Sequence, residues 1–292
     1  MLDPVYLDHV SDDMIELYTE LDQAIVRDIV RRLVKTGVIT DTARWQILRA
    51  QDSGLLYDEI IAEVAKISDT SAAHVQAMFE DAGIKAVQND AAIYEAAGKS
   101  PLPLKMSPAA MGVLNAGLSK TNGHLRNLTM TTASQAQQAY IRAATLAEMQ
   151  IESGAFDYAT AIRNAVQSAA QEGAWVSYPS GHRDRLDVAV RRAVLTGVGQ
   201  TTGQIGLAYA QDMGCDLMEI TAHAGARPSH AAWQGKLVSL SGRTGYLSLR
   251  DIGYNTGPGF KGWNCRHDWF PFFEGLSESA YPRSCLLYTS PS

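Results

Sequence analysis

Apolar residues recur at helical spacing through most of the first 213 residues, and this periodicity restricts the fold more than any other feature of the sequence. The clearest stretch covers residues 11–36, where Ser11 is a predicted N-cap and Gly37 a predicted end. Its apolar stripe consists of Met14, Leu17, Leu21, Ile25, Ile29 and Leu33. The pattern predicts packed helices rather than a large sheet.

Capping residues and breakers divide the rest of this region into further predicted helices. We expect a short helix after Thr40, others over residues 55–67 and from 68 or 70 towards 98, and a hinge at 99–103. Helices are then predicted from 108, from 131 to 152, from 157 to 173 and from 182 to 213, with an extended turn at 174–181.

Small residues in two of these helices leave alternatives open. Four glycines in helix 182–213, each costing about 1 kcal/mol relative to alanine, indicate either close approach of a neighbouring helix or subunit, or a local break. They are Gly197, Gly199, Gly203 and Gly206. Alanines at helical spacing in 131–152 indicate either a contact surface between subunits or a core helix. They are Ala133, Ala136, Ala139, Ala143, Ala144 and Ala147.

The pattern changes after Gly214, where glycine becomes frequent and helical spacing is lost. Short apolar runs at 217–220 and 236–240 predict strands, and Trp233, Trp263 and Trp269 provide large side chains for a small core. The expected fold is therefore mainly α, with an elongated helical body over about 1–214 and a small glycine- and aromatic-rich α+β module. We divide it into residues 1–98, residues 99–214 and residues 215–283.

Composition and the chain ends narrow the class of protein. The net charge of −6 argues against a dedicated nucleic-acid binder, and no run approaches the ~18 apolar residues of a membrane span. The first residues lack a signal-peptide pattern, and three cysteines do not form a disulfide framework, so a reducing cytosol is expected. Residues 285–292 match a translated sequencing adaptor, so we exclude Cys285 and expect the native chain to continue differently.

The candidate chemistry is concentrated in the last module, because the usual phosphate-loop, dinucleotide, serine-hydrolase and zinc-protease motifs are absent from the sequence. His223, His230, Cys265 and His267 are potential zinc ligands, with Cys215 a fifth candidate. Two other interpretations stay open. One is a hydrogen-bonded His230 with Cys265 as a small buried residue, and the other is a catalytic Cys265–histidine dyad.

Two short segments of this module, 227–236 and 262–267, are expected to meet in space. Each carries a tryptophan, Trp233 or Trp263, whose burial needs a partner surface. Each also carries polar groups that would need hydrogen bonds or a metal once they are buried. We therefore predict that His230 lies near Cys265 and His267, with both tryptophans buried.

The same two segments resemble the phage minor capsid protein 2 family, which is similar in organisation to the Mu F-like head morphogenesis proteins. The first segment contributes Arg227, Pro228, Ser229, His230, Trp233, Gly235 and Lys236. The second contributes Gly262, Asn264, Cys265, Arg266 and His267. The resemblance extends to 178–181 and 191–202, and His267 stands where the family pattern has a second cysteine.

This resemblance implies a structural virion protein of a tailed bacteriophage. It would be made in the host cytoplasm and located in the head, near the portal, in few copies and without an established enzyme activity. The implied partners are the portal and capsid proteins, with packaged phage DNA and a further copy of the chain as additional candidates, and no membrane. The competing hypotheses are a metal-dependent hydrolase or nuclease and an effector delivered with the DNA, either of which would use the His/Cys module.

Overall fold

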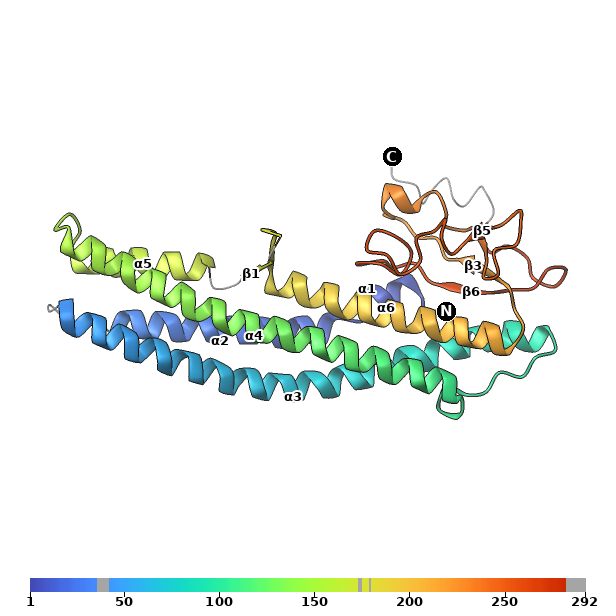
Figure 1. Ribbon diagram of the computed structural model, residues 1–292, viewed down its shortest axis with the longest axis horizontal. Helices are drawn as coiled ribbons and strands as arrows, with labels where there is room; N and C mark the ends of the chain where they lie inside the picture. Colours follow the sequence, from blue (N-terminus) through green and yellow to red (C-terminus); the bar gives the residue numbers. More distant parts are fainter. Residues whose placement is uncertain (36–41, 173–174, 179, 282–292) are drawn as a thin grey trace. The chain divides into compact units, whose positions relative to one another are not determined.

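The computed structural model describes residues 1–35, 42–172, 175–178 and 180–281, and it is mainly helical (Figure 1). Its α-helices are α1 (Pro4–His9), α2 (Asp12–Lys35), α3 (Thr42–Ala96), α4 (Pro108–Glu152), α5 (Tyr158–Glu172) and α6 (Leu186–Asp212). Two short 3-10 helices are η1 (Leu104–Met106) and η2 (Pro228–His230). The predicted end of the first helix at Gly37 and the predicted adaptor-derived residues 285–292 lie outside the described residues.

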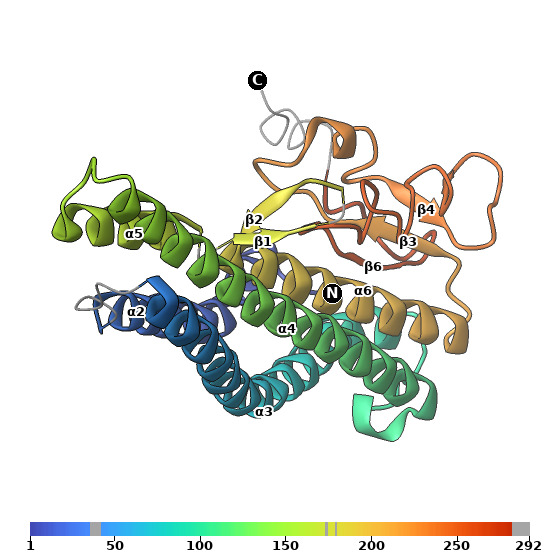
Figure 2. The same cartoon turned by 60° about the vertical axis from the view of Figure 1, so that its left-hand side comes forward.

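The strands form two separate sheets. β1 (Trp175–Ser177) and β2 (Arg183–Arg185) form an antiparallel hairpin in which Trp175 pairs with Arg185. The second sheet has the order β5-β4-β3-β6, and Figure 2 shows β3 between β4 and β6. Its strands are β3 (Leu217–Ile220), β4 (Leu237–Ser239), β5 (Leu247–Ser248) and β6 (Trp269–Phe272). The predicted small strand-containing C-terminal module is thus confirmed.

The chain divides into two compact units, each assembled from stretches that are distant in sequence. Unit 1 contains residues 1–12, 74–122 and the described residues from 192 onward. Unit 2 contains the described residues of 13–73 and 123–191. Helices α3, α4 and α6 contribute residues to both units.

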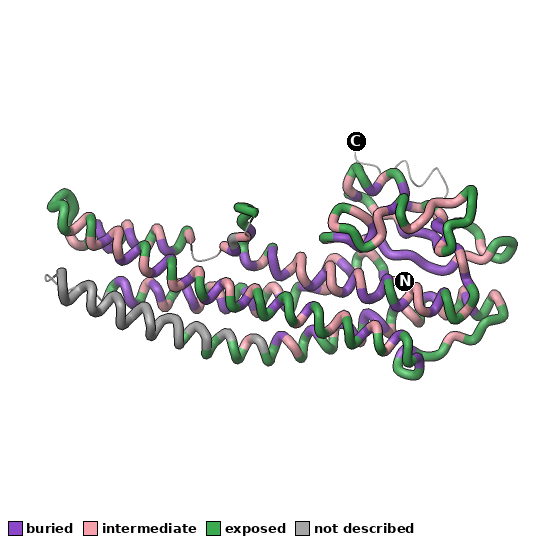
Figure 3. The backbone as a smooth tube through the Cα atoms, viewed as in Figure 1, coloured by how far each residue is buried: buried purple, intermediate pink, exposed green. Residues whose placement is uncertain are grey.

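The core of unit 2 is made by α2 and the alanine-rich half of α4, whose buried stripes are purple in Figure 3. Five predicted stripe residues of α2 are 2% exposed or less, and they are Met14, Leu21, Ile25, Ile29 and Leu33. All six alanines of the α4 stripe are likewise at most 1% exposed. Of the two alternatives, the core-helix interpretation of these alanines is therefore correct for this chain.

Three predicted helix boundaries are wrong, and at two of them threonine hydroxyls bond within the helix instead of capping one. Residues 42–96 form the single helix α3, and α4 continues through the predicted start at 131–132. The hydroxyls of Thr70, Thr131 and Thr132 donate to the carbonyl four residues earlier at 2.8–3.0 Å. A threonine can make this bond inside a helix as readily as it caps one, so the sequence signal is ambiguous.

Helix α6 begins at Leu186 rather than at residue 182, because residues 183–185 pair with β1 as strand β2. The helix is continuous through its glycines, so the local-break interpretation is wrong. A Cβ atom placed on Gly197 would overlap the side chain of Thr121 in α4, and one on Gly203 would lie 3.0 Å from Lys261. The glycines therefore let α6 approach both α4 and the C-terminal module.

Aromatic rings form the core of the C-terminal module within unit 1. Trp269 stacks on Tyr254 with centroids 5.1 Å apart and lies 4.9 Å from the ring of Phe260. A Cβ atom on Gly206 of α6 would lie 3.1 Å from Nε1 of Trp269, so the tryptophan is packed against the helix backbone. Among the described helices, none contains a stretch that is long and apolar enough to cross a bilayer.

Candidate metal centre

The first site loop, residues 221–236, leaves β3 and returns in β4. Backbone hydrogen bonds close its base, because Gly235 donates to Ile220 at 3.0 Å and Ile220 donates to Lys236 at 3.1 Å. Gly235 has a φ angle of 66°, a conformation that favours glycine, and this explains why the motif has a glycine at this position. Helix η2 lies in the loop and carries His230 at its last position.

The second site loop, residues 249–268, precedes β6 and is tightly wound. Lys261 and Asn264 both have positive φ angles, of 59° and 53°. A Cβ atom on Gly262 would overlap the carbonyl groups of residues 256 and 257, so this motif position accepts only glycine. The amide of Cys265 donates to the Gly262 carbonyl at 3.2 Å, and the Cys265 side chain is buried.

His230, Cys265 and His267 form a compact buried cluster. One potential ligand atom from each residue lies within 4.8 Å of those from the other two. The Cys265 Sγ atom is 3.7 Å from His267 Nδ1, and the His230 and His267 ring centroids are 5.2 Å apart. All three residues are at most 3% exposed. The two segments that were predicted to meet therefore do so, and the histidine of one faces the cysteine and histidine of the other.

Hydrogen bonds to oxygen atoms orient both imidazoles of this cluster. His230 Nε2 lies 2.8 Å from the Pro258 carbonyl oxygen, which can only accept, so Nε2 carries the hydrogen and Nδ1 has the lone pair. His267 Nε2 lies 3.3 Å from Oε1 of Gln234, and donation to this oxygen leaves a lone pair on His267 Nδ1, which faces Cys265. Such outer contacts typically fix the ring orientation of metal-binding histidines.

Burial controls the protonation of the cluster. Desolvation, reinforced by the nearby His223 and His230, lowers the pKa of His267 to about 2. Desolvation also lowers the pKa of His230, although its hydrogen bond to Pro258 opposes the shift. Burial raises the pKa of the Cys265 thiol, and the positive charge of Lys261 only partly offsets this effect. Near neutral pH the pocket thus holds two neutral imidazoles and a protonated thiol.

The two other predicted ligand candidates are placed differently. The His223 ring lies against the His267 ring with centroids 4.2 Å apart. Its Nδ1 is 2.9 Å from the Ala224 carbonyl oxygen, whereas its buried Nε2 makes no hydrogen bond within the described part of the chain. His223 therefore borders the cluster. Cys215 does not join it, because its thiol donates to the Leu217 carbonyl at 3.2 Å at the start of β3.

Arginines and tryptophans of the motif support the two loops. The Arg227 guanidinium donates to the Trp263 carbonyl and so links the first loop to the second. Arg266 pairs with Asp8 of α1 at 2.9 Å. Trp233 is buried, and its ring lies 4.7 Å from the ring of His267.

The predicted burial of Trp263 is wrong, because this side chain is 61% exposed. A Cβ atom on Gly257 would lie 2.9 Å from the Trp263 ring, so the indole packs over this glycine. Most of the indole surface stays exposed to solvent. The short turn at Gly257 offers too little surface to bury an indole completely.

A buried ion pair next to the cluster was missed from the sequence. Lys261 Nζ lies 2.6 Å from Asp268 Oδ1, and both side chains are at most 2% exposed. Asp268 Oδ2 also accepts from the Leu2 amide at 2.6 Å. Burial raises the pKa of Asp268, but Lys261, the amino terminus and the Leu2 hydrogen bond outweigh it and lower the pKa. No periodicity or motif in the sequence predicts that Lys261 and Asp268 form an ion pair. The only local indication of a role for Asp268 was that it follows His267.

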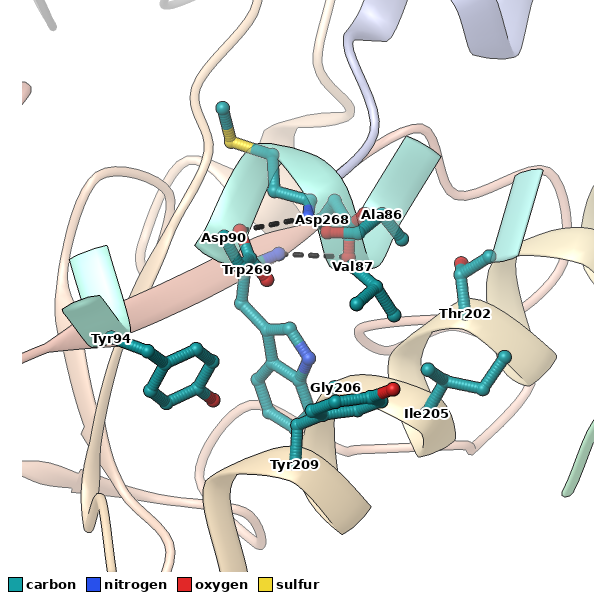
Figure 4. A pocket seen from close by; sticks show the side chains of 11 residues that line it. Ala86, Val87, Asp90, Tyr94, Thr202, Ile205, Gly206, Tyr209, Asp268 and Trp269 are labelled. Carbon is teal, nitrogen blue, oxygen red and sulfur yellow. Dashed lines mark hydrogen bonds and ion pairs between the residues drawn. The ribbon is translucent and has the colours of Figure 1, made fainter. Parts of the chain in front are cut away.

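Asp268 also borders a small pocket formed by α3, α6 and β6 (Figure 4). The amino group of Met1 lies 2.8 Å from Asp90 Oδ1 and donates to the Ala86 carbonyl at 2.6 Å. Burial raises the pKa of Asp90 to about 6, although the Met1 amino group opposes this shift. These two bonds of the Met1 amino group attach the first described residue to α3 at the pocket.

The chemistry of the site fits binding better than catalysis. A cysteine nucleophile needs a lowered thiol pKa and access to substrate, whereas Cys265 has a raised pKa and is buried. Two imidazoles with a thiol are a donor set that suits zinc. The close packing of Trp233 and the two loops around the cluster is typical of a closed structural site.

Comparison with known proteins identifies the family of the chain. The profile of the family described as Phage minor capsid protein 2 matches residues 2–286. A structural protein of Lactococcus phage LL-H is 29% identical over 103 residues, which are 33% of this chain and 28% of that protein. The match thus spans about a quarter of the relative's length, and no solved structure matches. Since the family profile covers nearly the whole sequence, the chain belongs to the phage minor capsid protein 2 family.

Proposed function

We propose that this protein is a minor structural component of a tailed-phage head, located where the portal meets the capsid and present in few copies. The observation that carries this proposal is the family match over residues 2–286, which includes both site loops and the helices of both units. The relative described as a structural protein, which matches part of the chain, supports the structural role. Portal and capsid proteins are the partners that this location requires.

The side-chain arrangement supports a structural role over the hydrolase and effector hypotheses. The His/Cys cluster is buried beneath Trp233, and the motif glycines Gly235 and Gly262 serve backbone geometry. Arg227 and Arg266 bind a carbonyl and a carboxylate of this same chain. Several residues that carry the family resemblance, among them His230, Cys265 and His267, therefore have structural contacts within the folded chain.

Fractionation of a phage that encodes this protein tests the proposal. DNA-filled heads are separated from tails, and the protein is quantified against the portal and major capsid proteins, with a tail protein as the control. We expect it in the head fraction at a ratio to portal of order one, and cross-linked to portal. Recovery with tails, or at the abundance of the major capsid protein, would refute the proposed location. Loss from heads together with ejected DNA would instead support the delivered-effector hypothesis.

A further inference from the structure

We propose that His230, Cys265 and His267 bind one zinc ion, with His223 as the fourth ligand, and that this ion fastens the two site loops together. The proposal rests on the geometry of the cluster and does not depend on where the protein lies in the virion. Soft thiolate and imidazole ligands favour zinc over magnesium or calcium, which prefer oxygen.

The spacing of the donor atoms is close to that of a zinc site. Ligand atoms around a tetrahedral zinc ion are about 3.3–3.8 Å apart, given Zn–N and Zn–S distances near 2.0–2.3 Å. Here the three donor atoms lie within 4.8 Å, and Cys265 Sγ is already 3.7 Å from His267 Nδ1. A contraction of about an ångström, through small side-chain rotations, therefore completes the triangle.

The outer contacts of the cluster leave suitable lone pairs for the metal. His230 Nε2 is occupied by the Pro258 carbonyl and His267 Nε2 by Gln234, so both residues offer Nδ1. A carbonyl or amide oxygen behind each imidazole is the usual arrangement in metal sites. Among the described residues, the His267 nitrogen that faces the cluster makes its one hydrogen-bond contact with the Cys265 thiol, at 3.7 Å.

The fourth position is assigned to His223 because of an unpartnered nitrogen. Its Nε2 is buried and makes no hydrogen bond with any described residue, which is unfavourable for a polar atom unless another group binds it. The ring already contacts that of His267 at 4.2 Å between centroids. Four protein ligands make a closed site, as expected for a metal that stabilises a fold.

Binding releases one proton from the Cys265 thiol, because the thiolate is the zinc ligand and both cluster imidazoles bind in their neutral form. The proton passes to solvent, and no oxidant or reductant is required. The ion then connects loop 221–236 to loop 249–268, which protein contacts join through Arg227 and Trp263.

Metal analysis of the full chain tests the site. The wild-type protein is expressed with added zinc, dialysed against metal-free buffer and analysed for bound metal, with one zinc ion expected per chain. Cys265→Ser and His230→Gln should lose the zinc. The matched controls Cys215→Ser and His124→Gln change a buried cysteine and an exposed helical histidine outside the cluster, and both should keep it.

Cobalt spectroscopy and thermal unfolding of the wild type keep the test independent of whether variants fold. Cobalt-loaded wild type should show the visible bands of tetrahedral Co²⁺ and thiolate-to-cobalt charge transfer, and Cys285→Ser should retain both. Zinc should raise Tm, and chelation should reverse the rise. A folded wild type that binds no metal, with the same Tm in zinc and in chelator, refutes the site.

Chelator competition separates the fourth ligand from the other three. His223→Gln should keep the charge-transfer band but release zinc at a chelator concentration at least tenfold lower than wild type. An unchanged release would show that His223 is not a ligand, while loss of the band would place it among the residues essential for binding.

Discussion

At the scale of single residues, the most demanding feature is the buried pair of Lys261 and Asp268. Each charge lies out of water, so each depends on the other, and backbone hydrogen bonds further stabilise the Asp268 carboxylate. The Leu2 amide binds the second carboxylate oxygen, and the Trp269 amide donates to the first at 2.9 Å. The carboxylate therefore joins the first residues of the chain to the last strand.

Replacing Lys261 by methionine should destabilise the protein by about 3–5 kcal/mol, because it leaves the Asp268 charge buried without its partner. Methionine keeps much of the side-chain length that packs against Gly203. Denaturant unfolding measures the change. Lys236→Met, at an exposed lysine, should stay within about 0.5 kcal/mol of wild type.

The double variant Lys261→Met with Asp268→Asn distinguishes a lost charge balance from lost packing. Asparagine removes the unpaired charge and keeps an acceptor oxygen, so more than half of the lost stability should return. If Lys261→Met alone changes stability by less than about 1 kcal/mol, the pair is not a desolvated one.

Asp90 should give the protein a specific pH dependence. Its folded-state pKa is raised to about 6 from an ordinary 3.8, so the native state holds this proton more tightly than the unfolded state. The resulting contribution to the free energy of unfolding is fully present below pH 3.8 and is lost as pH rises through about 6. The difference in unfolding free energy between wild type and Asp90→Asn should therefore decrease by about 3 kcal/mol across this pH range. Denaturant titrations of both proteins measure it, and a difference that is flat or rises with pH contradicts the assignment.

At the scale of elements, residue types that often mark the first or last residue of a helix lie here in the interior of helices. Thr70, Thr131 and Thr132 bond to carbonyls one turn back, and the glycines of α6 provide contact surface. The apolar stripe of α2 was predictable because one spacing identifies both the helix and its buried face. Strand β2 was not, because Arg183, Asp184 and Arg185 show no apolar alternation and are ordered by pairing with β1.

Gly197→Ala and Gly199→Ala form a matched pair on α6. Alanine at Gly197 would overlap the Thr121 hydroxyl, so we expect a loss of about 1–3 kcal/mol in spite of better helix propensity. At Gly199 the nearest neighbour atom would be 3.8 Å from the new Cβ, so alanine should be neutral or stabilising by up to about 1 kcal/mol. Thermal unfolding of the two variants measures the contrast, and equal effects would mean that α4 and α6 are not in close contact.

The candidate site was predictable in its members but not in its surroundings. His230, Cys265 and His267 could be grouped because two short segments with polar residues and tryptophans need each other to be buried. Gln234 and Lys261 could not be assigned, since their partners are set by the winding of loop 249–268 and by positive φ angles at Lys261 and Asn264. The exposure of Trp263 was missed because burial was inferred from residue type alone.

At the scale of the whole molecule, the C-terminal module shares its core with distant parts of the chain. Trp269 packs against α6, and Asp268 binds Leu2, so residues 192–281 belong to one unit with 1–12 and 74–122. Each unit is therefore a product of several sequence segments, and this division follows from tertiary contacts that no local pattern encodes.

A fragment of residues 215–283 should not fold by itself, because its Lys261 and Trp269 lose the α6 surface and Asp268 loses its Leu2 contact. We expect poor dispersion in its amide NMR spectrum and rapid proteolysis. Co-expression with residues 1–214 should restore protection. A dispersed, protease-resistant spectrum of the isolated fragment would show that the module is autonomous.

The hydrogen bond between Leu2 and Asp268 joins residues that are 266 positions apart. During synthesis, the described segments of unit 2 have all been translated once residue 191 is made, whereas unit 1 still lacks β3 to β6. Unit 2 can therefore begin to fold on the ribosome, but unit 1 cannot be completed until the residues through β6 have been made. Because native contacts of unit 1 join residues as far apart as Leu2 and Asp268, we expect unit 1 to fold more slowly than unit 2.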